Sequence, residues 1–454
     1  MIPKPISTER IARFHAAEAA RFLADHPRCV VLHARAQRHF LFGVPLHWMA
    51  DAPTPAPLYV DKAQGARLFD VDGHALIDFC LGDTGAMFGH SPAAIARTLG
   101  EHGADGATTM LASTVALEVA DLLEQRFGLP MWQFTATASD ANRFVLRWAR
   151  ALTGRKHIAV FNGCYHGTVD DVFVDLDADG ATHTRPSLLG QVQDLTAYTR
   201  VVEFNDLDAL RAALGAGDVA CVLTEPVLTN IGMVLPEPGF LDAVRALTRE
   251  HGALLMIDET HTLSCGPGGY CREHGLQPDV LVLGKPIAGG TPGAAYGFTA
   301  EVGARMQAAK TAAPPGHSGI GTTLSAGLLT LRLMRAMLAE VMTEAAYAQM
   351  FAIAQRVADG LHGVIARHAL PWTVTRIGAR CEVQFAPQRP RNGSEARAAF
   401  DDALEPALQL ALINRGVLLT PFHNMLLASP AHTAEDAQTL IHAFNAALTA
   451  LRAA

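Results

Sequence analysis

The middle of the chain alternates between short apolar runs and helical patterns. From about residue 80 to 330, continuous apolar runs stand where buried strands are expected, and helical stretches such as 238–251 separate several of them. These runs occupy 157–161, 201–204, 219–224, 253–257 and 280–283. Strand, helix and strand at this spacing predict an α/β fold, in which a mostly parallel sheet is sandwiched by helices.

The two ends of the chain lack the regular alternation of strands and helices that is predicted for the middle. Residues 8–40 predict an amphipathic helical entry, and Asp72-Gly73 between two short strand-like runs predicts a hairpin. The C-terminal part predicts helix, strands, helix and helix at 327–368, 372–386, 394–415 and 433–452. We therefore expect a large domain over 81–330 and a smaller α+β domain over 331–454, to which the N-terminal segment 1–80 contributes.

Composition narrows the class of protein. Half of the 454 residues are hydrophobic and 18% are charged, which excludes wholesale disorder. The net charge of −8 and the scattered basic residues argue against a nucleic-acid partner, and no apolar stretch approaches the roughly 20 residues of a membrane span. The start of the chain has no apolar signal core, and seven cysteines spread along it fit a reducing compartment. We expect a cytoplasmic protein without a membrane partner.

Polar residues follow the predicted strands at the edge where ligands of open α/β sheets bind. These residues are Tyr165 and His166, Glu225 and Asn230, Asp258 and His261, and Lys285. Lys285 is one of only five lysines. A lysine amine can attach an aldehyde covalently, and an acid on a neighbouring strand can hold a protonated ring nitrogen. The two together predict a pyridoxal phosphate enzyme.

A phosphate cradle is expected at the start of the helix that follows residue 137. Small residues and a hydroxyl at a helix start, here Ala138 and Ser139, offer free backbone N–H groups to an anion. Tyr165 can stack on an aromatic ring.

These residues resemble the class III aminotransferases of fold type I, and their motifs are most similar to those of the glutamate-1-semialdehyde 2,1-aminomutases. The shared motifs are Gly-Cys-Tyr-His-Gly at 163–167, Glu-Pro-Val with an asparagine at 225–230, Pro-Gly-Phe-Leu at 238–241, Leu-Gly-Lys at 283–285 and Gly-Thr-Thr-Leu at 321–324. The resemblance runs in order from about residue 58 to the C-terminus.

The resemblance implies a role for each matching position. Lys285 forms the Schiff base with pyridoxal 5'-phosphate and moves the proton, and Asp258 pairs with the pyridine nitrogen. The cofactor contacts are completed by Ala138 and Ser139 at the phosphate, Tyr165 over the ring, Asn230 and His261 near the ring hydroxyl, and His166 and Glu225 at the same strand ends. Thr323 is expected to reach the phosphate of a second subunit, which implies a homodimer with shared active sites.

Three departures from the family pattern bear on the substrate. Ala138 replaces a loop glycine, His261 replaces an uncharged residue, and Gly82–Gly85 stands where many relatives place bulky pocket residues. Arg376, Arg380 and Arg415 are candidates for binding a substrate carboxylate, because the guanidinium fork of arginine suits a carboxylate. Of these three we favour Arg380. Trp48 is a further candidate for the pocket.

The leading hypothesis is an aminotransferase that moves an amino group from an amino acid or amine to a keto acid or aldehyde through a Lys285 aldimine. An isomerase is the alternative, either a glutamate-1-semialdehyde-type aminomutase or an amino-acid racemase. A non-catalytic binding protein on the same scaffold is the third hypothesis. No metal is expected, because the spacing of His261, Cys265, Cys271 and His274 matches no common zinc site.

Overall fold

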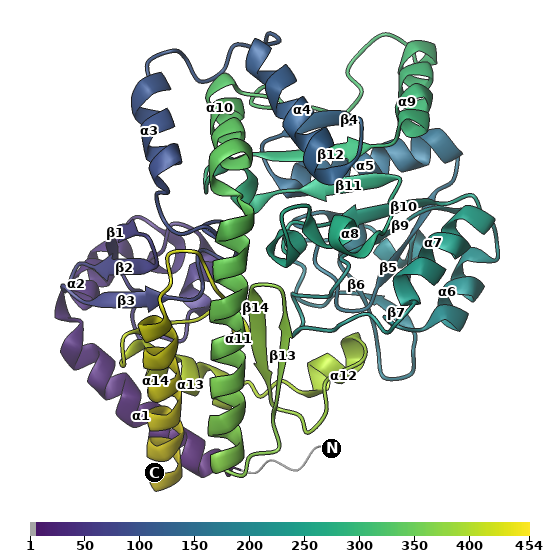
Figure 1. Cartoon of the computed structure of the whole chain (residues 1–454). Coiled ribbons are helices and arrows are strands. Elements are labelled where there is room, and N and C mark those ends of the chain that lie inside the picture. The colour runs from purple at the N-terminus through teal and green to yellow at the C-terminus, as the bar shows by residue number, and fades with distance from the viewer. Residues whose placement is uncertain (1–5) are drawn as a thin grey trace. The chain divides into compact units, whose positions relative to one another are not determined.

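The computed structural model describes residues 6–454, which form two compact units (Figure 1). Unit 1 contains the chain up to Pro92 together with Ala345–Arg389 and Ala398–Ala454. Unit 2 contains Ala93–Glu344 and Pro390–Arg397. The short segment Pro390–Arg397 lies within the C-terminal domain expected from the sequence, yet it packs in unit 2.

Unit 2 is built on a seven-stranded sheet in the order β4-β12-β11-β10-β9-β5-β8. The strands are β4 (Met131–Thr135), β5 (His157–Phe161), β8 (Thr199–Val202), β9 (Val219–Thr224), β10 (Leu254–Asp258), β11 (Val280–Leu283) and β12 (Ala294–Phe298). The five strands from β8 to β11 run parallel, whereas β12 is antiparallel to both of its neighbours. This sheet confirms the predicted mostly parallel α/β fold.

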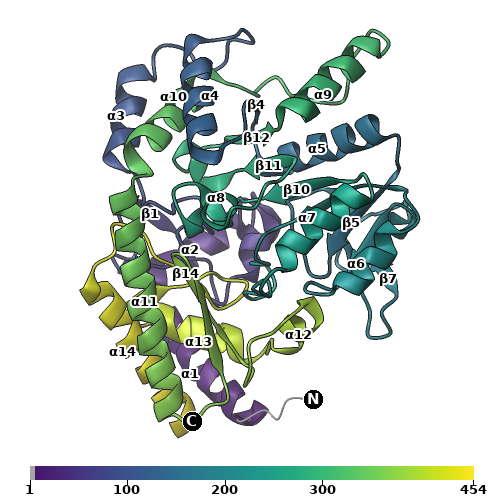
Figure 2. The ribbon, with the colours of Figure 1, turned by 45° about the vertical axis from the view of Figure 1, so that its right-hand side comes forward.

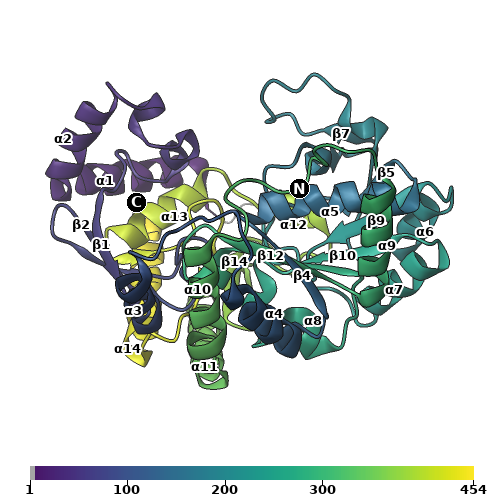
Figure 3. The ribbon, with the colours of Figure 1, turned by 90° about the horizontal axis from the view of Figure 1, so that it is seen from above.

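Helices cover both faces of this sheet. Figure 3 shows α5 (Ala138–Thr153) on one side of the strands and α4 (Thr114–Phe127), α7 (Phe240–Glu250) and α8 (Gly269–His274) on the other. Strands β9, β10 and β11 are buried along their whole length, which explains their continuous apolar runs. The other helices of the unit are α3 (Ala93–His102), α6 (Leu207–Leu214), α9 (Ala300–Ala312), α10 (Leu328–Ala336) and α12 (Gly393–Ala398).

Short elements complete unit 2. A small antiparallel pair is formed by β6 (Val174–Leu176) and β7 (Thr182–Thr184). The 3-10 turns are η3 (Asp170–Val172), η4 (Leu195–Ala197), η5 (Thr262–Cys265) and η6 (Lys285–Ala288), and η7 (Met337–Val341) is a π-helical turn. Lys285 is the first residue of η6, two residues after the end of β11, and η5 begins four residues after Asp258, the last residue of β10.

Unit 1 joins the two ends of the chain around one apolar core. Its sheets have the orders β1-β2-β3-β15 and β13-β14-β16. Their strands are β1 (Val60–Gln64), β2 (Arg67–Asp70), β3 (Ala75–Asp78), β13 (Thr373–Ile377), β14 (Arg380–Gln384), β15 (Val417–Leu418) and β16 (Met425–Leu427). The antiparallel pairing of β2 with β3 across Gly73, whose φ is +97°, confirms the predicted hairpin.

The helices of unit 1 pack on these sheets. They are α1 (Thr8–Asp25), α2 (Pro27–Ala36), α11 (Glu344–Arg367), α13 (Leu404–Ile413) and α14 (Ala434–Ala453), with 3-10 turns η1 (Leu41–Gly43) and η2 (His47–Asp51). Figure 2 shows α11 beside α14 and α13, and their buried side chains belong to one core. Within residues 6–454, no helix combines the length and the apolar character that crossing a bilayer requires.

Candidate active site

Parallel strands of unit 2 bring the candidate catalytic residues to one edge of the sheet. Strand β10 ends at Asp258, and β11, its parallel neighbour, ends two residues before Lys285. Asp258 lies opposite Val282 in this pairing. The loop with His166 follows β5 at the same edge, because β5, β9, β10 and β11 all run in one direction.

Asp258 is a buried carboxylate held by three donors. Oδ2 accepts hydrogen bonds from Asn142 Nδ2 at 2.7 Å and His166 Nδ1 at 3.1 Å, and Oδ1 accepts one from the backbone N–H of Thr260 at 3.0 Å. Burial alone would raise the pKa of Asp258, but the hydrogen bond and charge of His166 lower it. Burial alone would lower the pKa of His166, but Asp258 raises it. The pair therefore presents an ionised carboxylate that suits a cationic ring nitrogen.

Asn142 belongs to this site although the sequence analysis did not single it out. Its Nδ2 also donates to the backbone oxygen of His166 at 3.0 Å, so it joins the ends of β5 and β10. A signal was present, because Asn142 stands among Ala141, Val145 and Ala149 on the buried face of α5. A buried amide on an apolar helix face requires partners, and here they are the candidate residues His166 and Asp258.

Lys285 presents its amine to His261. The Nζ atom is hydrogen-bonded to Nε2 of His261 at 2.5 Å, which is shorter than an ordinary hydrogen bond between nitrogens. The backbone of Lys285 has φ of +48°, a left-handed conformation that costs a side-chain-bearing residue free energy. Such a conformation persists only where its surroundings enforce it, and it is common at functional sites.

The first turn of α5 packs directly against the residue before Lys285. A Cβ atom on Gly284 would lie 2.7 Å from Cβ of Ala138, so only glycine fits there without a shift. A Cβ on Gly167 would lie 2.1 Å from Oγ of Ser139. The first N–H groups of a helix have no partner within it, and a phosphate bound there would lie beside the strand ends of Asp258 and Lys285.

Glu225 and Asn230 form a second buried cluster after β9. The Glu225 carboxylate accepts hydrogen bonds from Thr229 Oγ1 at 2.5 Å and from Asn230 Nδ2 at 3.2 Å. Burial raises the pKa of Glu225 to about 7, although the nearby His166 charge acts to lower it. A Cβ on Gly163 would lie 2.3 Å from Ile231, so this loop packs against the loop after β5.

Two further candidates in unit 2 are more exposed. Tyr165 is 40% exposed, and its ring makes an edge contact with Phe173 at 6.4 Å between centroids. Thr323 is exposed in the loop between α9 and α10. Ring stacking by Tyr165 and a phosphate contact from Thr323 stay predictions.

The two substrate candidates belong to unit 1. Trp48 lies in η2 and makes an edge contact with Phe422 at 5.6 Å. Arg380 begins β14, is fully buried, and donates to Thr84 Oγ1 and, at 3.0 Å, to Met425 Sδ. Thr84 lies in the Gly82–Gly85 segment, and its φ of +85° is strained for a β-branched residue. The contacts with substrate stay predictions.

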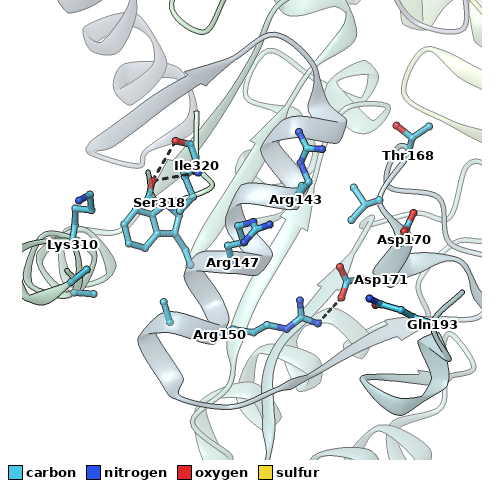
Figure 4. A pocket seen from close by; sticks show the side chains of 15 residues that line it. Arg143, Arg147, Arg150, Thr168, Asp170, Asp171, Gln193, Lys310, Ser318 and Ile320 are labelled. Carbon is cyan, nitrogen blue, oxygen red and sulfur yellow. Dashed lines mark hydrogen bonds and ion pairs between the residues drawn. The ribbon is translucent and has the colours of Figure 1, made fainter. Parts of the chain in front are cut away.

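A cavity of about 700 Å³ lies along the exposed face of α5 (Figure 4). Arg143, Arg147 and Arg150 point into it from successive turns, and Arg150 pairs with Asp171 at 2.6 Å. None of the residues around Lys285 lines this cavity. Thr168, which lines the cavity, donates its backbone N–H to Ser139 Oγ at 3.0 Å, so the cavity adjoins the predicted phosphate cradle.

Comparison with known proteins gives one consistent family. The model of the family "Aminotransferase class-III" matches residues 48–448. A glutamate-1-semialdehyde 2,1-aminomutase of Anaeromyxobacter sp. (strain Fw109-5) is 32% identical over 397 residues, which covers 86% of this chain and 90% of that protein.

Solved structures extend the likeness to the whole chain. A crystal structure described as a glutamate-1-semialdehyde aminomutase from Pseudomonas aeruginosa PAO1 is 48% identical with a TM-score of 0.97, and it covers 99% of this chain and 100% of that one. A lysine-to-alanine variant of it was solved in complex with PMP. An omega-transaminase from Sphaerobacter thermophilus is 29% identical with a TM-score of 0.85, covering 93% and 98%.

Proposed function

The chain belongs to the class III aminotransferase family, and we propose that it moves an amino group between two carbons of one substrate, as an aminomutase of the glutamate-1-semialdehyde type. The observation that carries this proposal is the 48% identity to the Pseudomonas aeruginosa protein over 99% of the chain. The curated relative that is 32% identical has the same name. This choice reverses the leading sequence hypothesis and adopts its alternative.

Pyridoxal phosphate is the cofactor of this family, and the residues at the strand ends fit it. Lys285 offers an amine for its aldehyde, Asp258 an ionised carboxylate for its ring nitrogen, and the first turn of α5 free N–H groups for its phosphate. When bound, it supplies an electron-withdrawing ring that stabilises negative charge on the carbon next to the amine.

The chain's own residues would handle the proton. The amine of Lys285 can take a proton from one substrate carbon and return it elsewhere, as a general base and then a general acid. His261 lies 2.5 Å from that amine and can hold the shared proton between the two steps. Asn142 and His166 keep the Asp258 carboxylate oriented and negative throughout.

An aminotransferase is the second candidate, because it uses the same groups but exchanges two substrates. The departure at His261 from the family pattern lies beside Lys285, where a change of side chain can alter how the proton is moved. The likeness to an omega-transaminase, with a TM-score of 0.85, supports this candidate.

A single-substrate assay separates the two reactions. The holoenzyme is incubated with glutamate 1-semialdehyde alone, and the isomer with its amine on the neighbouring carbon is measured. We expect turnover without a keto acid, and none with Lys285→Ala. Consumption of the substrate that requires an added keto acid such as pyruvate would favour the aminotransferase, and no turnover under either condition would contradict the aminomutase proposal.

We further propose a homodimer, in which Thr323 lends its hydroxyl to the phosphate site of the partner. The exposure of Thr323 supports this proposal. We also propose a cytoplasmic location, because the seven cysteines, all buried, form no disulfide within residues 6–454, as expected in a reducing compartment.

A further inference from the structure

Three candidate metal ligands lie together in unit 1, which contains neither Lys285 nor Asp258. We propose that His26, Asp70 and His74 form a binding site for a divalent transition metal of the zinc class. Imidazole nitrogen and carboxylate oxygen are ligands that Zn²⁺ takes in proteins, with water in the remaining position of a three-ligand site.

The distances between the ligand atoms suit one metal ion. Asp70 Oδ2 lies 3.3 Å from His26 Nε2 and 2.9 Å from His74 Nδ1. All three ligand atoms lie within 4.8 Å of one another. Ligands bound tetrahedrally at about 2.0–2.1 Å from zinc are roughly 3.3 Å apart, so only small side-chain movements would complete the geometry.

The hydrogen bond at Nδ1 of His26 leaves a lone pair on Nε2, which faces the carboxylate of Asp70. His26 Nδ1 lies 2.9 Å from the backbone oxygen of Phe22, which can only accept, so Nδ1 carries a proton. In the neutral ring, Nε2 is then an acceptor, and it is buried without a hydrogen-bond partner. A lone pair and a carboxylate oxygen 3.3 Å apart repel each other unless a cation lies between them. That cation is either a metal ion or an extra proton.

The surroundings of His26 match those of a metal ligand. Histidine ligands commonly donate their second N–H to a backbone carbonyl, which fixes the ring, and Phe22 provides that carbonyl here. The Phe22 ring also stacks on the imidazole with 4.0 Å between centroids. The ring of His26 is therefore held in place before any metal binds.

Asp70 and His74 provide orientation and access. The backbone N–H of His74 donates to Oδ1 of Asp70 at 2.8 Å, which leaves Oδ2 for the two histidines. The Asp70 side chain is buried, whereas that of His74 is 40% exposed. A metal ion can thus enter beside His74, and water can take the remaining position.

The two other potential ligands nearby, Asp72 and Cys29, have hydrogen-bond partners of their own. The Asp72 carboxylate accepts the backbone N–H groups of Arg28 at 2.7 Å and Cys29 at 3.0 Å. The Cys29 sulfur accepts the backbone N–H of Tyr59 at 3.4 Å, and Cys29 is not part of the group of ligand atoms that lie within 4.8 Å of one another. The ligand set is therefore two histidines and one aspartate.

A metal here would tie three segments of unit 1 together. His26 stands between α1 and α2, Asp70 ends β2, and His74 lies in the hairpin turn directly before β3. Binding to the folded state alone raises the free energy of unfolding. The site is therefore structural, and its occupancy does not require turnover.

Zinc binding to the holoenzyme tests the proposal. The protein is stripped with a chelator, dialysed and titrated with Zn²⁺ by calorimetry, and Co²⁺ is added separately to record its visible absorption. We expect one equivalent of Zn²⁺ per chain, a tetrahedral Co²⁺ spectrum and a higher unfolding temperature. His74→Ala removes an exposed ligand, so it should fold normally and bind at least about 100-fold more weakly.

His102→Ala is the matched control, since it removes a histidine from an exposed pair with Asp105 (2.9 Å) that has no third ligand. It should bind Zn²⁺ as the wild type does. Asp70→Asn should also abolish the Co²⁺ spectrum while cofactor content and circular dichroism show that the fold is retained. Absence of stoichiometric Zn²⁺ binding, or equal binding by His74→Ala, would overturn the proposal and leave a buried imidazolium at His26.

Discussion

His261 contacts the amine of Lys285, the proposed catalytic group, so we expect its replacement to alter proton handling and to leave Lys285 in place. We predict that His261→Gln lowers kcat about 100-fold, because glutamine can hydrogen-bond to Nζ but cannot carry the proton. KM should change less than about threefold, and the pH profile of kcat should lose one ionisation. Steady-state kinetics across pH measure all three quantities.

The matched control is His274→Gln, which changes an exposed histidine of α8. Its kinetics should equal those of the wild type. If His261→Gln kept the wild-type kcat and pH profile, His261 would only fill space beside the amine.

Glu225 should make stability depend on pH. Its pKa rises from 4.5 to about 7 on folding because burial disfavours the charge. Between these values the folded state holds a proton that the unfolded state has lost, so the free energy of unfolding falls as pH rises through this window. The full effect is at most about 3 kcal/mol. Glu225→Gln should therefore gain unfolding temperature relative to the wild type between pH 5 and pH 8.

Thermal unfolding of both holoproteins at the two pH values measures this gain. Glu250→Gln, at the exposed end of α7, is the control and should show a constant difference from the wild type. A difference for Glu225→Gln that is equal at pH 5 and pH 8 would contradict a neutral Glu225 in the folded state.

Strands that form continuous aliphatic runs could be predicted from the sequence, and others could not, although β12 is buried along its whole length. β9 and β11 have the predicted bounds, because burial on both faces requires a continuous apolar run. β4 and β12 were missed, because β12 reads Ala-Ala-Tyr-Gly-Phe and β4 contains exposed Gln133. Gly297 fits in β12 because the ring of Trp132 lies over it, where a Cβ would be 2.6 Å away. That contact is between strands far apart in sequence.

Part of the site was predictable for the same reason. Asp258 and Lys285 follow neighbouring buried strands, and parallel strands end at one edge. The hydrogen bond from Asn142 to Asp258 could not be predicted, because it depends on which face of α5 is turned toward the sheet. The contact of His261 with Lys285 likewise depends on the turn η5, which no local pattern specifies.

The close packing of α5 against the end of β11 predicts that one substitution weakens cofactor binding and that a second, compensating substitution restores it. Gly284→Ala should weaken pyridoxal phosphate binding at least about tenfold, because the new Cβ would push Ala138 and the first turn of α5 away. The added Ala138→Gly should restore binding, since it removes the atom that clashes. Cofactor titration of the three variants measures the coupling.

Ala138→Gly alone is the control and should bind the cofactor within about threefold of the wild type. If the double variant bound no better than Gly284→Ala, the defect would lie in the backbone at Lys285, not in the contact with Ala138.

Unit 1 is assembled from both ends of the chain, so residues that are distant in sequence contact one another in its core. Its core joins helices α11, α13 and α14 with strands near the N-terminus, such as the one that carries Ile77. Trp48 and Arg380 are 332 positions apart in sequence, yet both belong to this unit. Interactions across such separations follow from the fold, and a local pattern cannot predict them.

The proposed sharing of sites between subunits can be tested by mixing two defective chains. Lys285→Ala should be inactive, and Thr323→Glu should be weak because a carboxylate near the phosphate repels it. If Thr323 serves the partner's site, a mixed dimer has one site with an intact Lys285 and an intact Thr323. Co-refolding equal amounts should then restore about a quarter of all sites, since half of the dimers are mixed.

Recovery of activity distinguishes the two arrangements because it depends only on which chain supplies each residue. If Thr323 instead acted within its own chain, every site with Lys285 would also contain the glutamate, and mixing would restore nothing. A co-refolded mixture of wild type and Lys285→Ala controls for assembly, and its activity should scale with the wild-type fraction. Exposed Thr323 tolerates the substitution sterically, so a loss of activity in Thr323→Glu at full dimer content reports on the phosphate contact and not on folding.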